Sequence, residues 1–249
     1  MVFQLICDYL CEVRRIGEDR RWGSASDAAA RVHPGLVRRG NEDAACADAR
    51  LSLALVADGL GGHQQGEIAS RVAIETTVRS FGRRGGVAPT TATTARRLRS
   101  AIEDADLEVR AQPGAIDAPP MGTTLVALAQ GAGYVVVAHV GDSRCYRLRG
   151  DELSRLTRDH DEHPLVGRRL TRCLGGGCAL EVEVLTSDAR SGDVYVLCSD
   201  GLWEAVPDAD VRDIAASARD AADACERLIH AACRAGGHDN IGVAVVRVE

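Results

Sequence analysis

The amino-acid sequence predicts an α+β fold, in which antiparallel sheets pack in a sandwich with helices, and not a doubly wound parallel sheet. Two observations support this prediction. Apolar runs separated by hairpin-type turns recur in the second half of the chain, and helical patterns occur in two separate pairs. The hydrophobic content of 45% is sufficient for a core. Since aromatic residues make up only 3%, Val, Leu, Ile and Ala must fill it.

The length of 249 residues fits one domain with a short extension. Residues 1–25 are charged and only weakly periodic, so we expect them to form an N-terminal extension. We expect residues 26–249 to form the single folded domain.

The first half of the domain is predicted to contain one buried strand and two helices. Residues 51–57 are an apolar run, broken only by Ser52, that ends at Asp58, which is typical of a strand buried on both faces. Apolar residues at helical spacing predict one helix over residues 66–81 and a second over residues 95–110. The Gly-, Pro- and Thr-rich segments that follow these helices are expected to be loops, over residues 82–94 and 111–120.

The second half changes to a pattern of strands. Turn residues separate neighbouring apolar runs at two positions, which predicts two hairpins. The expected strands are residues 123–129, 134–140, 144–148, 152–156, 180–184, 194–198 and 241–248. The expected helices are residues 208–218 and 221–235, and they lie between the last two strands.

Six short motifs occur in order along the chain, and most of their aspartates lie just after an apolar run and beside a glycine. The motifs are residues 38–43 (RRGNED), 58–63 (DGLGGH), 121–124 (MGTT), 141–144 (GDSR), 199–201 (SDG) and 239–240 (DN). An Asp-Gly pair alone usually marks only a turn. Several carboxylates at strand ends can converge, however, and hard oxygen ligands are what Mg²⁺ and Mn²⁺ prefer. The motifs together therefore predict a divalent-metal site.

Composition excludes several other classes of protein. The formal charge of −6 argues against nucleic acid and anionic membranes as main partners. All 30 basic residues are arginine, which excludes a Walker-type lysine and a Schiff-base lysine. The nine cysteines include no Cys-x-x-Cys pair and are expected to be reduced thiols. No run approaches the ~20 apolar residues of a membrane span, so we expect a cytoplasmic protein without membrane insertion.

The ordered set of motifs resembles the metal-dependent serine/threonine protein phosphatase family (type 2C, PPM) in its compact bacterial form. The resemblance runs from about residue 35 to residue 248, and its most specific part is residues 55–70, LVADGLGGHQQGEIAS. It implies a four-layer α-β-β-α sandwich of two antiparallel sheets flanked by helices. It also implies hydrolysis of phosphoserine and phosphothreonine in proteins by water that two Mn²⁺ or Mg²⁺ ions activate. The implied partners are phosphorylated proteins, with a bacterial Ser/Thr kinase and its substrates among them.

The resemblance further implies which residues hold the two metal ions. Asp58 would bridge both ions, and the Gly59 carbonyl would ligate the second. Asp200 and Asp239 would ligate the first, while Glu42 would hold a metal-bound water. Two adjacent dications lower the pKa of a bridging water, which supplies a nucleophile near neutral pH.

The remaining implied roles concern a third metal and the substrate. Asp142 together with Asp200 would serve a third, weaker metal ion. Arg38 would bind the substrate phosphate, since a guanidinium can donate two parallel hydrogen bonds to it. His63 would transfer a proton or position the substrate; the alternative is a loop histidine without a catalytic role.

The residues present argue against two other kinds of phosphatase-related protein. A cysteine phosphatase requires Cys-x₅-Arg, and no cysteine here has an arginine six positions later. A pseudophosphatase that only binds phosphoproteins is the alternative from another class. Every matched ligand position keeps its carboxylate, which favours the enzyme. His139, just before the 141–144 motif, is expected to be a packed strand residue and not a ligand.

The sequence departs from the bacterial pattern between residues 160 and 170. Relatives carry a flap of roughly two dozen residues there, and most of it is missing in this chain. We therefore expect residues 159–169 to form a short surface loop that leaves the metals open on that side. The third metal would then be held mainly by water and two carboxylates, and weakly.

Overall fold

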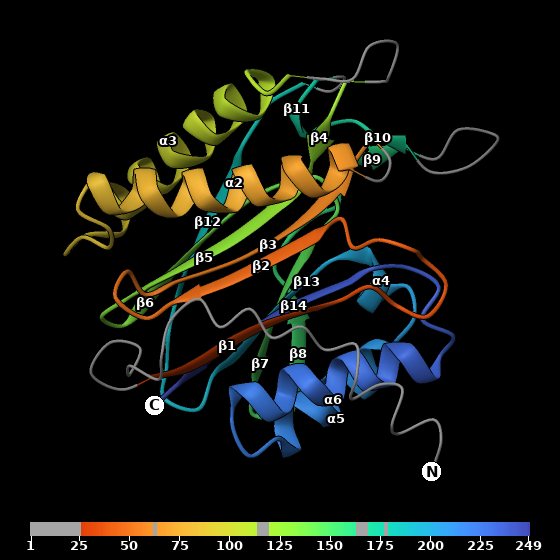
Figure 1. Cartoon of the computed structure of the whole chain (residues 1–249). Coiled ribbons are helices and arrows are strands. Elements are labelled where there is room, and N and C mark those ends of the chain that lie inside the picture. The colour runs from red at the N-terminus through yellow and green to blue at the C-terminus, as the bar shows by residue number, and fades with distance from the viewer. Residues whose placement is uncertain (1–25, 62–63, 114–119, 163–168, 177–178) are drawn as a thin grey trace.

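The structure, a computed structural model, describes residues 26–61, 64–113, 120–162, 169–176 and 179–249. In these residues two antiparallel sheets pack face to face, and helices cover the outer face of each sheet (Figure 1). The predicted α-β-β-α sandwich is confirmed. The predicted N-terminal extension, residues 1–25, lies outside the described residues and stays a prediction.

The first sheet has seven strands and is antiparallel throughout. Its strand order is β11-β4-β3-β5-β6-β12, and β2 pairs with β3 beside this path. The strands are β2 (Asp43–Asp48), β3 (Leu53–Leu60), β4 (Gly122–Thr123), β5 (Leu125–Gly131), β6 (Tyr134–Val140), β11 (Leu174–Gly175) and β12 (Glu183–Asp188).

The second sheet has five strands in the order β1-β14-β13-β7-β8, also antiparallel. Its strands are β1 (Ser26–His33), β7 (Arg144–Arg149), β8 (Glu152–Arg155), β13 (Val194–Cys198) and β14 (Ile241–Val248). A separate two-stranded ladder joins β9 (Asp161–Glu162) to β10 (Arg169–Leu170).

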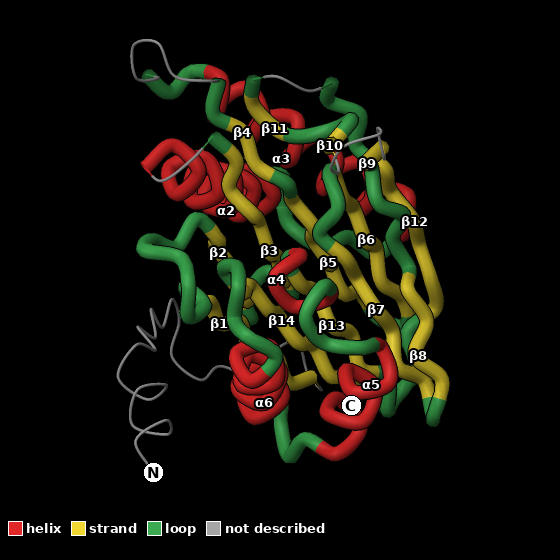
Figure 2. The backbone as a smooth tube through the Cα atoms, turned by 90° about the vertical axis from the view of Figure 1, so that its right-hand side faces the viewer, coloured by secondary structure: helices red, strands yellow, loops and turns green. Residues whose placement is uncertain are grey.

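The helices form the two outer layers (Figure 2). α2 (Gln64–Arg83) and α3 (Thr91–Arg110) pack on the first sheet, and α4 (Asp200–Trp203), α5 (Asp208–Ser217) and α6 (Ala221–Arg234) pack on the second. Side chains fix the starts of the two best-capped helices. Thr90 accepts a hydrogen bond from the Thr93 amide, and Asp220 accepts one from the Asp223 amide. No described helix has the length and apolar character that crossing a bilayer requires.

Burial on both faces explains why residues 53–57 of β3 are a continuous apolar run. Leu53 and Leu55 contact the layer of α2 and α3, whereas Ala54 and Val56 contact the second sheet. Successive side chains of a strand point to opposite faces, so both sets must be apolar when both faces are covered. The central strands β13 and β14 follow the same rule.

The predictions for single elements were mostly right. The short elements β11 and α4 were not predicted, and three further segments differ. β1 and β2 were not predicted, because alanines and charged residues give them no clear apolar alternation. The strand predicted over residues 180–184 instead spans β12, since it pairs with β6 through residues 183–188. The segment 159–169 is not a plain surface loop, because β9 and β10 pair at its ends; residues 163–168 lie outside the described part.

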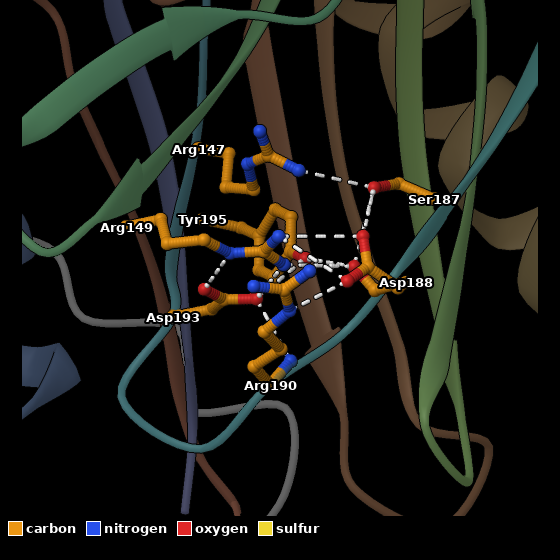
Figure 3. A network of polar contacts seen from close by, with 7 residues as sticks. All are labelled: Arg147, Arg149, Ser187, Asp188, Arg190, Asp193 and Tyr195. Carbon is orange, nitrogen blue, oxygen red and sulfur yellow. Dashed lines mark hydrogen bonds and ion pairs between the residues drawn. The ribbon is translucent and has the colours of Figure 1, made fainter.

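One edge of the sandwich is held by an ion-pair network that joins the two sheets (Figure 3). Arg149 at the end of β7 makes two hydrogen bonds of 2.7 Å to Asp193 and also contacts Asp188 at the end of β12. Arg147 donates to Ser187 on β12 at 3.1 Å. Bidentate arginine–carboxylate pairs of this kind fix orientation as well as adding energy. The other edge of the sandwich carries a different set of carboxylates.

A buried histidine gives the fold an acid-sensitive position. His33 at the end of β1 is buried, and its Nδ1 accepts a hydrogen bond from the Gly35 amide at 3.0 Å. Burial, and then the charge of His230, lower the pKa of His33 below 6.5. Below about pH 6.5, His33 therefore binds a proton more readily in the unfolded chain than in the folded chain.

His33 is expected to lower the free energy of unfolding as the pH drops from 7.5 to 5.5, by up to about 1.4 kcal/mol per pH unit, while the raised pKa values of Asp43 and Asp58 act in the opposite direction. His33→Asn keeps an acceptor for Gly35 and should reduce this pH dependence, whereas exposed His238→Asn should not. Urea unfolding in EDTA at pH 7.5 and at pH 5.5 measures this difference in pH dependence between the variants. Identical pH dependence in wild type and His33→Asn would show that His33 does not contribute.

Candidate metal centre

Strand register brings the ends of six strands to the same edge of the sandwich. β2 pairs with β3 so that Asp43 lies opposite Asp58, and β6 runs parallel to β3 through their shared neighbour β5. In the second sheet Cys198 at the end of β13 pairs with Arg144 and Val243 at the starts of β7 and β14. Five aspartates lie at these strand ends: Asp43, Asp58, Asp142, Asp200 and Asp239.

The electrostatics show that these carboxylates converge. Burial raises the pKa of Asp58 well above its usual range, and the charges of Asp43, Asp200, Asp142 and Asp239 raise it further, in that order. Carboxylates shift one another in this way only when they are close and incompletely screened. The structure therefore brings together the four aspartates that the sequence analysis selected, together with a fifth.

The fifth carboxylate is Asp43, which the sequence analysis did not select. Burial raises its pKa, with the charges of Asp200 and Asp239 adding to the effect and a hydrogen bond from Ser199 opposing it. Its Oδ2 accepts that hydrogen bond at 2.6 Å, and its carboxyl group also lies within hydrogen-bonding reach of the Asp58 carboxyl group. The first motif contains Asp43 directly after Glu42, so the sequence offered this residue as a candidate. Only the pairing of β2 with β3, however, places Asp43 opposite Asp58.

Two glycines let Glu42 approach the start of α2. The Gly59 amide donates to the Glu42 carbonyl at 3.1 Å, and a Cβ on Gly66 would overlap the Glu42 carboxylate. A Cβ on Gly59 would in turn overlap the Gly66 carbonyl. Any other residue at either position would push the chain segments apart, so these glycines set the position of Glu42 and of the Gly59 backbone.

Asn240 ties the loop before β2 to the loop before β14. Its Oδ1 accepts from the Glu42 amide at 2.8 Å, and its Nδ2 donates to the carbonyls of Pro34 and Gly40 at 2.9 and 2.8 Å. One side chain thus uses three of its hydrogen bonds to fix the backbone on both sides of Arg38. The sequence analysis noted Asn240 only as part of a motif.

Arg38 lies at the rim of the carboxylate cluster. Its guanidinium donates to Asp239 Oδ2 at 2.7 Å, and the side chain is 56% exposed. The hydrogen bond and charge of Asp239, followed by Glu42 and Asp200, raise the pKa of Arg38. The neighbouring Arg39 is exposed and makes no ion pair with any described residue. The two adjacent arginines therefore differ, since of the two only Arg38 pairs with a carboxylate of the cluster.

The Gly141-Asp142 turn is held from two sides. The Trp203 indole donates to the Asp142 carbonyl at 3.1 Å, and the Gly141 amide donates to His160 Nδ1 at 3.2 Å. The Arg144 guanidinium stacks over the Trp203 ring at 3.5 Å, which fixes the indole in turn. Asp142 therefore faces the cluster from a rigid turn.

Thr124 links two of the aspartate segments. Its Oγ1 accepts a hydrogen bond from the Asp58 amide at 3.0 Å and lies 2.7 Å from Ser143 Oγ, next to Asp142. Thr124 is fully buried, so water cannot take the place of its hydroxyl group as a partner of the Asp58 amide and Ser143. The MGTT motif thus has a structural meaning, because its last threonine positions Asp58 relative to Asp142.

Thr124→Val keeps the shape of this side chain and removes both interactions. We expect a loss of about 1–3 kcal/mol in the free energy of unfolding, the cost of leaving a buried amide unsatisfied. We also expect Mn²⁺ affinity to fall by roughly 10–100-fold, as when the partner of a metal ligand is lost. Urea unfolding and calorimetric Mn²⁺ titration measure the two effects. Thr186→Val, at an exposed position of β12, is the control. Wild-type Mn²⁺ affinity in Thr124→Val would disprove the link.

A second group of metal-binding residue types lies beside the Gly141 turn. One ligand atom each from His139, His160 and Glu183 lies within 4.8 Å of the others. The guanidinium of Arg172 is 3.1 Å from His160 Nε2 and 3.9 Å from Glu183 Oε2. A cationic group already occupies this position, so the cluster orients His160 for its bond to Gly141. His139 is buried within β6 and stacks on His160, as expected for a packed strand residue.

The cluster of aspartates fits divalent cations. It offers carboxylate oxygens and the Gly59 carbonyl, which are the hard ligands that Mg²⁺ and Mn²⁺ prefer. Without cations, several negative charges face one another in a half-buried place, and the raised pKa of Asp58 is the consequence. The Asp43 carboxyl group, which is close enough to hydrogen-bond with Asp58, adds further oxygen atoms to the same cluster. His63, the predicted proton donor, lies outside the described residues.

Comparison with known proteins agrees with this geometry. Residues 37–233 match the family model described as protein phosphatase 2C. The chain is 36% identical over 244 residues to the serine/threonine protein phosphatase PstP of Mycobacterium tuberculosis. The matched region covers 88% of this chain but only 44% of PstP. It is 31% identical to the serine/threonine phosphatase stp of Listeria innocua, covering 87% of this chain and 93% of that protein.

Solved structures give the same result. The catalytic domain of PstP in complex with two manganese ions superposes with a TM-score of 0.76 at 32% identity, over 90% of this chain and 98% of that one. That protein binds its ions on the fold that this chain shares. The match of sequence over most of the chain, the shared fold and the carboxylates at one edge lead to one conclusion: this chain belongs to the protein phosphatase 2C family of metal-dependent serine/threonine phosphatases.

Proposed function

We propose that this chain hydrolyses phosphoserine and phosphothreonine in proteins with the help of two Mn²⁺ or Mg²⁺ ions. The observation that carries the proposal is the convergence of five aspartates, each from a different motif, at one edge of the sandwich. The relatives named as serine/threonine protein phosphatases support it, and so does the structure of PstP with two manganese ions. Since the chain spans less than half of PstP, the proposal concerns this domain.

The residues proposed to hold the ions are Asp58, as the bridging ligand, with the Gly59 carbonyl, Asp200, Asp239 and Glu42. Asp43 joins this set because its carboxyl group interacts directly with that of Asp58, which lies opposite it across β2 and β3. When bound, the ions supply electrophilic stabilisation of the phosphate and a water of lowered pKa. A third and weaker ion is proposed for Asp142 and Asp200, both of which act on Asp58 electrostatically.

The protein's own contribution is to orient the phosphate. Arg38 reaches the cluster through an exposed, unbranched side chain, and its present partner Asp239 is also a proposed ligand. A cation on Asp239 would weaken that ion pair by competing for the same carboxylate. The guanidinium would then be free to donate two hydrogen bonds to phosphate oxygens. Charge developing on those oxygens would be stabilised without reorganisation of the site.

The direct test of this function is turnover of a phosphothreonine peptide with Mn²⁺ and with EDTA. We expect hydrolysis with Mn²⁺ and none with EDTA. Tight binding of the peptide without turnover, at any Mn²⁺ concentration, would favour the pseudophosphatase alternative. We further propose that the substrates are proteins phosphorylated by a bacterial Ser/Thr kinase, and that the enzyme acts in the cytoplasm.

Arg38→Ala is expected to lower kcat/KM for a phosphothreonine peptide by about 10–100-fold, which corresponds to about 1.4–2.7 kcal/mol. The reason is the loss of charge-assisted hydrogen bonds to the phosphate. The control is Arg39→Ala with a peptide free of acidic residues, for which we expect less than a twofold change. Equal losses in both variants would reject the assignment of Arg38.

A further inference from the structure

Two exposed apolar side chains lie directly beside the proposed phosphate-binding arginine. Among the described residues, the exposed large apolar side chains are Leu36 (40%), Val37 (61%) and Leu107 (66%). Leu107 lies on α3, on the outer face of the first sheet. Leu36 and Val37 are consecutive and precede Arg38, so the exposed apolar surface is continuous with the metal centre.

The loop that carries these side chains is fixed. The Leu36 amide donates to the Gly237 carbonyl at 2.7 Å. Gly35 has a φ of +76°, and a Cβ there would overlap the Asp239 carbonyl, so the loop lies against the segment of a proposed ligand. With Asn240 binding the carbonyls of Pro34 and Gly40, the loop is held at both ends and in the middle. Leu36 and Val37 are thus presented on a positioned backbone.

Charge adds a second element to this surface. Arg39 is exposed and forms no ion pair with residues in the described part of the chain, although the protein carries a formal charge of −6. An unpaired guanidinium at the rim attracts carboxylates, and the adjacent apolar side chains gain free energy when a partner covers them.

We propose that Leu36, Val37 and Arg39 form a recognition rim that binds the substrate segment next to the phosphorylated residue. This rests on the proposed function, because the phosphate on Arg38 is what brings the segment to the rim. Consecutive Cα atoms are about 3.8 Å apart, so an extended substrate with its phosphate at Arg38 places residues one to three positions away over Leu36 and Val37. The rim selects phosphoproteins with an apolar residue there, and an acidic residue nearby strengthens the selection.

The test uses a set of phosphothreonine peptides and the full chain with Mn²⁺. A parent peptide of Ala, Ser and Gly around the phosphothreonine is compared with peptides carrying one Leu at each of the three positions on either side. A second set adds one Glu to the best Leu peptide. The variants are Val37→Ser and Arg39→Gln, with Leu107→Ser as the matched control for an exposed apolar residue. Para-nitrophenyl phosphate, which has no flanking residues, reports basal activity.

We expect at least one Leu peptide to exceed the parent by about 3–10-fold in kcat/KM, the scale of a partly covered apolar contact. Val37→Ser should remove this preference for Leu peptides, whereas Leu107→Ser should keep it. Both variants should hydrolyse para-nitrophenyl phosphate at the wild-type rate. Arg39→Gln should remove only the gain from Glu, and high salt should reduce that gain.

Equal kcat/KM for parent and Leu peptides, or a preference that persists in Val37→Ser, would overturn the recognition rim and leave the phosphatase function intact. Absence of turnover for every peptide and for para-nitrophenyl phosphate would refute the proposed function, and the rim with it.

Discussion

Asp58→Asn is expected to lower kcat for a phosphothreonine peptide by at least about 1,000-fold, or about 4 kcal/mol in transition-state stabilisation. Asp58 is proposed to bridge both ions, so its replacement removes a ligand from each of them at once. The amide keeps the shape of the side chain and the Asp58 backbone bonds to Thr124. Steady-state kinetics at saturating Mn²⁺ measure the loss.

The same substitution should not destabilise the protein without metal. Burial and four neighbouring carboxylates disfavour the charged form of Asp58, so removing its charge relieves repulsion. We expect the melting temperature in EDTA to stay equal or rise. Asp151→Asn, in the exposed turn between β7 and β8, is the control for a surface aspartate. An Asp58→Asn enzyme with activity within tenfold of wild type would exclude Asp58 as the bridging ligand.

Mn²⁺ is expected to raise the melting temperature of the wild-type chain by roughly 5–10 °C when its concentration is about 100 times the dissociation constant. Binding to the folded state alone adds about 2.7 kcal/mol under that condition, and 1 kcal/mol corresponds to about 2–4 °C in a chain of this length. The physical source is neutralisation of the carboxylate cluster. Thermal melts with increasing Mn²⁺, followed by EDTA, measure the effect and its reversal.

The increase should be largely lost in Asp58→Asn and kept in Asp188→Asn, which alters only the ion-pair network at the other edge of the sandwich. If Mn²⁺ stabilised wild type and Asp58→Asn equally, the ion would bind elsewhere. The group of His139, His160 and Glu183 would then be the next place to examine.

The central strands could be predicted from the sequence because their environment imposes a simple pattern. β13 and residues 241–246 of β14 are buried on both faces and therefore carry no charged residue, and the predicted bounds of both strands agree with the structure. β1 and β2 were not predicted because they lie at or near sheet edges. Their polar and small residues do not give the apolar pattern from which a strand is recognised. Pairing partners, and not local residue preference, make these segments strands.

The candidate site was predicted as a set of residues but not as an arrangement. Each Asp-Gly motif indicates a turn at a strand end, and the motifs together indicated a metal centre. Asp43 could not be selected, since its proximity to Asp58 follows from the register between β2 and β3. The supporting roles of Thr124 and Trp203 also depend on contacts between segments distant in sequence.

Anomalous diffraction at the manganese edge from crystals grown with Mn²⁺ tests the central claim most directly. We expect two peaks about 3.5–4 Å apart, with Asp58 between them and Asp200 and Asp239 as ligands of one. Peaks located only at His139, His160 and Glu183, or no peak within ligand distance of Asp58, would contradict the assignment of this edge as the metal centre.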